Sequence, residues 1–162
     1  MSKAHRSSCD QLACSQADSH RGSALCLALS ASGLYAATLG SECILRLWDV
    51  RHTATAITQL DVRTPFVGVS HAVHSMAHSE VANYRQRLSM SPSEDQVALA
   101  AGLGGLAVSR LNLAEGSIRV PVKVPVPAAG SSGGVDTVEW HPNVDAVAFG
   151  CSMGAVGISH FT

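Results

Sequence analysis

Residues 44–49 read Ile44-Leu45-Arg46-Leu47-Trp48-Asp49, a short run of large apolar side chains closed by an acidic residue. A second apolar run, residues 35–38, precedes it, and the two are separated by a turn that contains Gly40. Runs of about 4–8 apolar residues bounded by Gly, Pro, Ser or Asn are typical of strands and are too short for free-standing helices. The stretch therefore predicts two strands joined by a tight turn.

The plan of strand, turn, strand, Gly-containing turn and strand occurs three times along the chain. Ser30, Ser91 and His141 mark the equivalent first turns, so the units are 91 − 30 = 61 and then 141 − 91 = 50 residues apart. The predicted first strands are residues 24–29, 87–90 and 135–140, the second strands 35–38, 97–101 and 146–150, and the third strands 44–50, 106–111 and 156–161. Such self-similarity at a regular spacing indicates a repeat architecture.

The spacings of 61 and 50 residues leave room in units one and two for a fourth strand and for additional segments. Residues 54–60 are predicted as a fourth strand of unit one, and residues 62–85 as an insertion. Residues 118–126 are predicted as the fourth strand of unit two, at an outer edge, because Pro121 and Pro125 cannot donate ladder hydrogen bonds. Residues 128–134, rich in Gly and Ser, are a predicted linker.

Unit one carries the most specific pattern. Trp48-Asp49 closes its third strand, Glu42 stands six residues before Trp48, Thr38 lies on the second strand, and His20 lies four residues before the first. These residues resemble a WD40 repeat, whose Trp-Asp signature, acidic turn residue, hydroxyl and histidine form a hydrogen-bonded tetrad. The resemblance implies that His20, Thr38, Glu42 and Trp48 tie the strands of this unit together.

The resemblance weakens outside residues 20–51. Glu42 stands where the family usually has aspartate, and Ser19 replaces the glycine before the histidine. In the other two units the tryptophan position holds Ser109 and Ser159, and the turn-acid position holds Leu103 and Met153. Trp140 ends a first strand and is not a signature tryptophan. Units two and three thus share only the architecture.

The expected fold is all-β: a partial WD40-like β-propeller of about two and three-quarter four-stranded antiparallel blades. The expected division is a tail or closing strand at 1–19, blades at 20–61 and 86–127, the insertion at 62–85, the linker at 128–134 and an incomplete blade at 135–162. Propellers close with about 4–8 blades. We therefore expect the chain to be part of a longer propeller, or a partner chain to complete the ring.

Composition limits the function. The net charge of −1 gives no overall attraction to a polyanion, so nucleic acid is expected as a partner only indirectly, if at all. The apolar runs are far shorter than the roughly 20 residues that cross a bilayer, and no secretory signal is evident. Five irregularly spaced cysteines do not suggest a disulfide framework. We expect an intracellular protein, cytoplasmic or nuclear, without membrane association.

Features that suggest chemistry have simpler interpretations. His71, His74 and His78 share one face of a helix and leave a zinc site open, but a polar insertion is favoured. The glycine-rich run 101–105 lacks the lysine and the helix of a phosphate-binding loop. No Gly-x-Ser-x-Gly nucleophile motif is present. We therefore predict no catalysis, no small-molecule substrate, no metal and no cofactor.

The resemblance implies a scaffold that binds other protein subunits within a multiprotein complex. The face formed by loops between blades would carry the contacts, with Phe66 and Tyr84 as aromatic anchors. The alternative function is a substrate-receptor or adaptor of a cullin-type ubiquitin ligase, because Trp48-Asp49-Val50-Arg51 resembles the Trp-Asp-x-Arg box of such receptors. The candidate partner-binding residues are Arg21, Arg51, Phe66, Tyr84, Leu103 and Met153.

Overall fold

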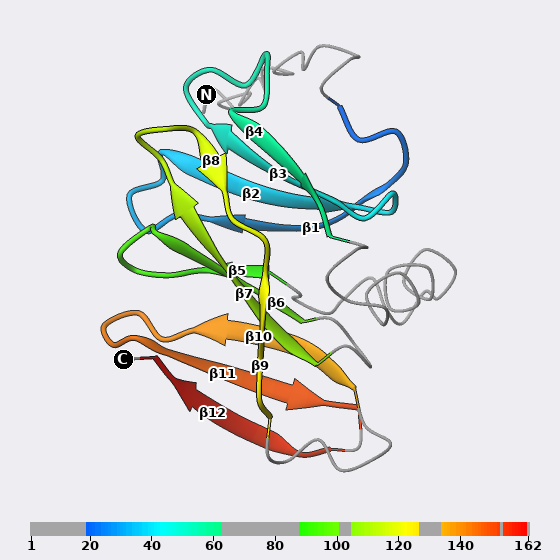
Figure 1. The fold of residues 1–162 in the computed structure, drawn as a ribbon, viewed down its shortest axis with the longest axis vertical. Helices are drawn as coiled ribbons and strands as arrows, with labels where there is room; N and C mark the ends of the chain where they lie inside the picture. Colours follow the sequence, from blue (N-terminus) through cyan, green and yellow to red (C-terminus); the bar gives the residue numbers. More distant parts are fainter. Residues whose placement is uncertain (1–18, 63–87, 101–104, 127–133, 153, 162) are drawn as a thin grey trace, which may run out of the picture.

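The computed structural model describes residues 19–62, 88–100, 105–126, 134–152 and 154–161. Every regular element in these ranges is a β-strand, and the strands form three separate antiparallel sheets. The sheets are stacked one above the next along the long axis of the molecule (Figure 1). The expectation of an all-β, antiparallel architecture is therefore confirmed, and the stack is open at both ends.

The first sheet has the strand order β1-β2-β3-β4. Its strands are β1 (Ala24–Leu29), β2 (Tyr35–Gly40), β3 (Ile44–Asp49) and β4 (Thr58–Asp61). The predicted start of the fourth strand at residue 54 was wrong, because the chain needs those residues to reverse direction after β3. Pairing resumes only where the Ile57 N–H donates to the Leu47 carbonyl, at 2.8 Å.

The second sheet contains β5 (Leu88–Met90), β6 (Gln96–Ala100), β7 (Leu106–Asn112), β8 (Ser117–Ile118) and β9 (Val122–Val124). The single outer strand predicted over 118–126 is instead two short strands. Both pair with β7, but the register shifts by one residue between Leu111↔Ile118 and Val108↔Val122. The interruption contains Pro121, which lacks the N–H that a continuous ladder needs.

The third sheet has three described strands in the order β10-β11-β12. They are β10 (Val135–Trp140), β11 (Ala146–Cys151) and β12 (Val156–His160). The predicted strands of this unit agree with them to within one residue at each end. In the part of the chain that the structure describes, β12 is the outer edge of this sheet.

Two cores form between the three sheets. On β6, Val97 and Leu99 belong to the core shared with the first sheet, whereas Ala98 and Ala100 belong to the core shared with the third. Successive side chains of a strand point to opposite faces. The second sheet is therefore buried on both faces, which explains its nearly continuous run of apolar residues.

The turns repeat as closely as the strands. The Ser30 N–H donates to the Tyr35 carbonyl and the Ser91 N–H to the Gln96 carbonyl, each at 2.9 Å. Gly33 and Glu94, three residues after these serines, both adopt a positive φ, of 70° and 62°. Cross-sheet hydrogen bonds join the units: the Ser32 N–H donates to Glu94 Oε1 at 2.6 Å. The spacing of 94 − 33 = 61 residues matches the repeat expected from the sequence.

Candidate functional site

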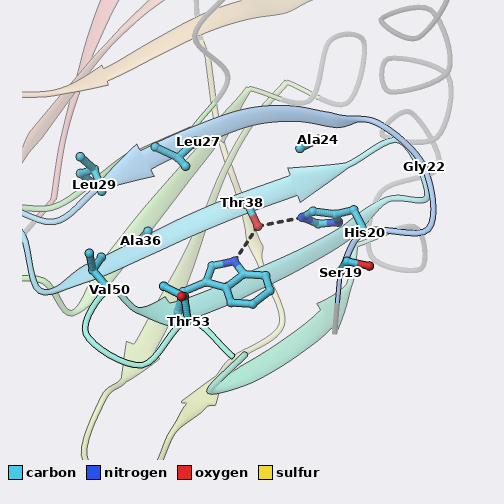
Figure 2. Close-up of a pocket in the computed structure, with 11 residues that line it drawn as sticks. Ser19, His20, Gly22, Ala24, Leu27, Leu29, Ala36, Thr38, Val50 and Thr53 are labelled. Atoms are coloured by element: carbon cyan, nitrogen blue, oxygen red, sulfur yellow. Dashed lines mark hydrogen bonds between the residues drawn. The ribbon is translucent and has the colours of Figure 1, made fainter. Parts of the chain in front are cut away.

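A chain of hydrogen bonds crosses the first sheet and includes all four tetrad residues chosen from the sequence. The Trp48 indole N–H donates to Thr38 Oγ1 at 2.8 Å. Thr38 Oγ1 lies 2.7 Å from His20 Nε2, and His20 Nδ1 lies 2.6 Å from Glu42 Oε1. Figure 2 shows Thr38 between the indole and the His20 ring. The structure thus brings together residues that span positions 20 to 48.

Strand register and one glycine position this network. Ala36 pairs with Trp48 and Thr38 with Arg46, so the Thr38 and Trp48 side chains lie on the same face of neighbouring strands. Gly40 ends β2 directly below the network. A Cβ at this position would lie 2.1 Å from Glu42 Oε2 and 2.2 Å from His20 Nδ1. Only glycine leaves room there for the carboxylate and the imidazole to meet.

Arg46 is a fifth member that sequence reasoning missed. Its guanidinium Nη1 donates to Glu42 Oε1 at 2.6 Å and also lies against the His20 ring. Arg46 is only 4% exposed, although arginine is rarely buried without a partner. Its position inside the apolar run 44–49, four residues after Glu42, was the signal that could have identified it.

The environment of Glu42 keeps its carboxyl group ionised. Partial burial raises the pKa of Glu42, but the hydrogen bonds from Arg46 and His20 outweigh this effect and lower the pKa below its ordinary value. The carboxylate is therefore stabilised in its charged form by the cation and the imidazole beside it. The network is charged and partly buried, and it connects the segment before β1 with β2 and β3.

The order hydroxyl, imidazole, carboxylate is also that of a catalytic triad, but here the groups are occupied. Thr38 is 9% exposed and its oxygen accepts a hydrogen bond from Trp48. Both ring nitrogens of His20 have partners within the network. A triad needs a nucleophile that a substrate can reach. The arrangement therefore favours a structural role, in which the polar side chains hydrogen-bond to one another, and only Glu42 Oε2 and Arg46 Nε of the network lack a partner among the described residues.

The Trp-Asp-x-Arg box forms a local ion pair. Arg51 Nε donates to Asp49 Oδ1 at 3.0 Å and Arg51 Nη2 donates to Asp49 Oδ2 at 2.8 Å. This fork lowers the pKa of Asp49 and raises that of Arg51. The Arg51 side chain is 55% exposed, so the pair lies at the surface. Its guanidinium already has a bidentate partner within the chain.

An apolar hollow of about 490 Å³ lies beside the network on the same face of the first sheet. Leu27, Leu29 and Val50 line it, together with Thr38 and Trp48 of the network. In Figure 2, Leu27 and Leu29 lie along β1 on this face. They are 56% and 59% exposed. This is the outward face of the first sheet, opposite the core that it shares with the second.

The remaining candidates divide into those that the structure places and those that it does not. Arg21 is exposed in the segment before β1. Phe66, Tyr84, Leu103, Met153 and the cluster His71, His74 and His78 lie outside the described residues. Within the described ranges no group of three or more His, Cys, Asp or Glu side chains is arranged to hold a metal ion. The same ranges contain no helix long and apolar enough to cross a membrane.

Comparison with known proteins supports the fold. No protein-family model matches the chain, and no curated protein matches it in sequence. A solved structure that is similar is the crystal structure of the Cps50 (Swd1) β-propeller domain of Myceliophteria thermophila, with a TM-score of 0.53 and 14% sequence identity. The match covers 84% of this chain and 37% of that chain, so this chain spans little more than a third of its length. The chain has the fold of an open segment of a β-propeller.

Proposed function

We propose that the chain is a WD40-like propeller segment that acts as a non-catalytic scaffold for other protein subunits in an intracellular complex. The observation that carries this proposal is the exposure of apolar side chains on the two end faces of the stack. Leu27 and Leu29 project from the outward face of the first sheet, and Val156 and Ile158 are 78% and 66% exposed on the third. Contiguous exposed apolar surface of this kind marks interaction sites.

The tetrad supports the WD40 part of the proposal. A network of indole, hydroxyl, imidazole and carboxylate is what the Trp-Asp signature of this family implies, and its distances of 2.6–2.8 Å are those of well-formed hydrogen bonds. It holds β2, β3 and the segment before β1 as one unit. A rigid sheet of this kind presents its outward face to a partner without ordering it first, which lowers the entropic cost of binding.

The experiment compares partner capture by three forms of the chain. The double variant Leu27→Glu/Leu29→Glu places two charges on the outward face of the first sheet. The control Leu34→Glu/Val144→Glu alters exposed apolar residues that lie in turns, at 38% and 49% exposure. We expect immobilised wild-type and control chains to retain the same proteins from a cell extract and the face variant to lose them, with unchanged circular dichroism. Retention of the same proteins by the face variant would refute the proposal.

The ubiquitin-ligase adaptor function stays a prediction, and among the described residues the Arg51 guanidinium is held by Asp49. Arg51→Ala tests it directly. Loss of adaptor binding by a folded variant would support this alternative over the scaffold.

A further inference from the structure

The outer edge of β12 offers a regular set of backbone groups. The Cys151 N–H donates to the Ala155 carbonyl and the Phe161 N–H to the Asp145 carbonyl, at 2.8 and 2.9 Å. In an antiparallel pair, residues that exchange hydrogen bonds alternate with residues that do not. With the register Phe149↔Gly157 and Val147↔Ser159, the odd-numbered residues of β12 bond to β11. The N–H and C=O groups of Val156, Ile158 and His160 therefore point away from the sheet.

The other two sheets show what lies at the corresponding edge. In the first, β4 pairs with β3, and in the second, β8 and β9 pair with β7. The outer strands of these neighbouring sheets contact each other, β4 against β8. By the same geometry, a strand added to β12 would lie beside β9. Among the described residues this place holds no strand.

A groove occupies that place. Its volume is about 700 Å³, and its walls come from the β7–β9 side of the second sheet and from Ser159, His160 and Phe161 on the third. Val122 and Val124 supply apolar surface on β9, and Val122 is 70% exposed. The groove therefore places the apolar surface of β9 beside the His160 end of the β12 edge, and an exposed strand edge is where an extended peptide can add to a sheet.

The same groove is lined by three cationic side chains, Arg110, Arg119 and Lys123. The ion pairs of the described residues involve His20, Arg46, Arg51 and His52 as the basic partners, and none of these three. Among the residues that the structure describes, no carboxylate side chain lines this groove. In a chain with a net charge of −1, three unpaired cations around one groove favour an acidic occupant.

Carboxylates line a neighbouring cavity and limit where an acidic occupant can lie. A neighbouring cavity of about 560 Å³ shares Arg110 and His160 with the groove and is lined by Asp95 and Asp145. An acidic ligand would be repelled there. The acidic side chains of an occupant therefore belong beside Arg119 and Lys123, which line the groove but not that cavity.

We infer that the β12 edge and the groove beside it bind an extended segment of a partner protein in which acidic and apolar residues alternate. The segment adds to the third sheet as its fourth strand. One set of its side chains points into the groove, toward Arg119 and Lys123, and the alternate set extends the outward apolar face formed by Val156 and Ile158. This inference rests on the proposed scaffold function and names the chemistry of one partner segment.

The first experiment measures hydrogen exchange at individual amides by NMR, with and without a peptide of about eight residues that alternates valine and glutamate. We expect the peptide to slow exchange at Val156, Ile158 and His160. The amides of Gly157 and Ser159, which bond to β11, serve as internal controls and change little. Binding that leaves the three outward amides unprotected would overturn the strand addition, and so would the absence of binding.

The second experiment tests the charge of the occupant by fluorescence anisotropy of the same labelled peptide. Arg119→Glu/Lys123→Glu is expected to weaken binding about tenfold or more, since each exposed ion pair contributes up to about 1 kcal/mol. Arg21→Glu, a single charge reversal at an exposed residue outside the groove, is the control, and Arg119→Glu and Lys123→Glu are each measured alone against it. Undiminished binding by the double variant would refute the acidic occupant. Tighter binding of a labelled single-stranded oligonucleotide than of the peptide would assign the groove to nucleic acid and overturn the inference.

The two proposals fail separately. The scaffold test uses Leu27 and Leu29 on the first sheet, whereas the present test uses the β12 edge and the groove beside β9. Loss of partners by the first-sheet variant together with no peptide binding would refute only the inference about β12. Peptide binding together with partner capture that is unchanged in the first-sheet variant would refute the proposed scaffold function and leave the strand addition at β12 standing.

Discussion

The first and third sheets are held together by different kinds of side-chain contact. In the first, Trp48 donates its indole N–H to Thr38, and a chain of polar groups continues to His20 and Glu42. In the third, Trp140 is 3% exposed and stacks on Phe161, with ring centroids 5.3 Å apart. Among the described residues no acceptor meets the Trp140 indole N–H.

The glycines of the two sheets show the same contrast. Gly40 leaves room for the carboxylate and the imidazole of the polar network. Gly157 leaves room for the Phe149 ring, whose Cζ would lie 2.4 Å from a Cβ at position 157. The first sheet thus depends on directional hydrogen bonds and the third on aromatic packing. A repeat can therefore retain its backbone while it loses its signature residues, provided that other contacts pack its strands.

The largest effect is expected for Gly40→Ala. The added methyl group would displace Glu42 or His20 and separate the buried Arg46 from its carboxylate. Breaking a buried charged pair costs about 3–5 kcal/mol. Urea unfolding of the variant should show a loss of this size. A loss below about 1 kcal/mol, within the usual range for a surface substitution, would show that the polar network does not hold the first sheet.

Gly157→Ala should have a smaller effect, because an aromatic ring is displaced and no charge is uncovered. Overpacking of a core costs about 1–3 kcal/mol. The same unfolding measurement applies, and the near-ultraviolet circular dichroism of the aromatic residues should change as well. A larger loss of stability for Gly157→Ala than for Gly40→Ala would contradict the claim that the polar network contributes more stability than the aromatic packing.

Matched tryptophan substitutions sharpen the comparison at the level of one hydrogen bond. Trp48→Phe removes the donor to Thr38, whereas Trp140→Phe removes a donor that has no acceptor among the described residues. Both lose similar volume. We expect Trp48→Phe to be the more destabilising by about 1 kcal/mol, the net worth of a hydrogen bond. Equal losses in thermal or denaturant unfolding would show that the Trp48 bond contributes nothing.

The smallest effect concerns pH and the first sheet alone. The pKa of Glu42 is lower in the folded chain than its ordinary value, so the folded state binds fewer protons in acid than the unfolded state. The stabilisation is therefore complete above the ordinary glutamate range and is lost as pH falls through the folded pKa. Glu42→Gln should give a shallower loss of stability between about pH 5 and pH 3. If the free energy of unfolding falls with pH equally steeply in the variant and the wild type, the Glu42 carboxyl group does not contribute a charge to the polar network.

The repeat could be predicted from sequence because it depends on local signals, the turn residues at Ser30 and Ser91, which set its spacing. His20, Thr38, Glu42 and Trp48 were chosen from the resemblance to a WD40 repeat, and hydrogen bonds join them in the structure. Arg46 was missed because it lay within an apolar run whose buried partner becomes evident only in three dimensions.

Features that depend on the third dimension were harder to predict. The alternating valines of residues 118–126 indicated one strand, but a proline and a shift in pairing along β7 divide it into β8 and β9. The cationic groove combines Arg110 on β7, Lys123 on β9 and Ser159 on β12. These residues are far apart in the sequence, and only the stacking of two sheets brings them to one surface.

The central claim is that the chain is an open stack of three propeller sheets whose end faces require a partner. Light scattering behind size exclusion, with circular dichroism of the same peak, tests it on the 162-residue chain. We predict a β-rich species larger than one chain, which Leu27→Glu/Leu29→Glu shifts toward the monomer. A folded, β-rich wild-type monomer that is stable at high concentration would contradict the account, because the exposed leucines would then need no cover.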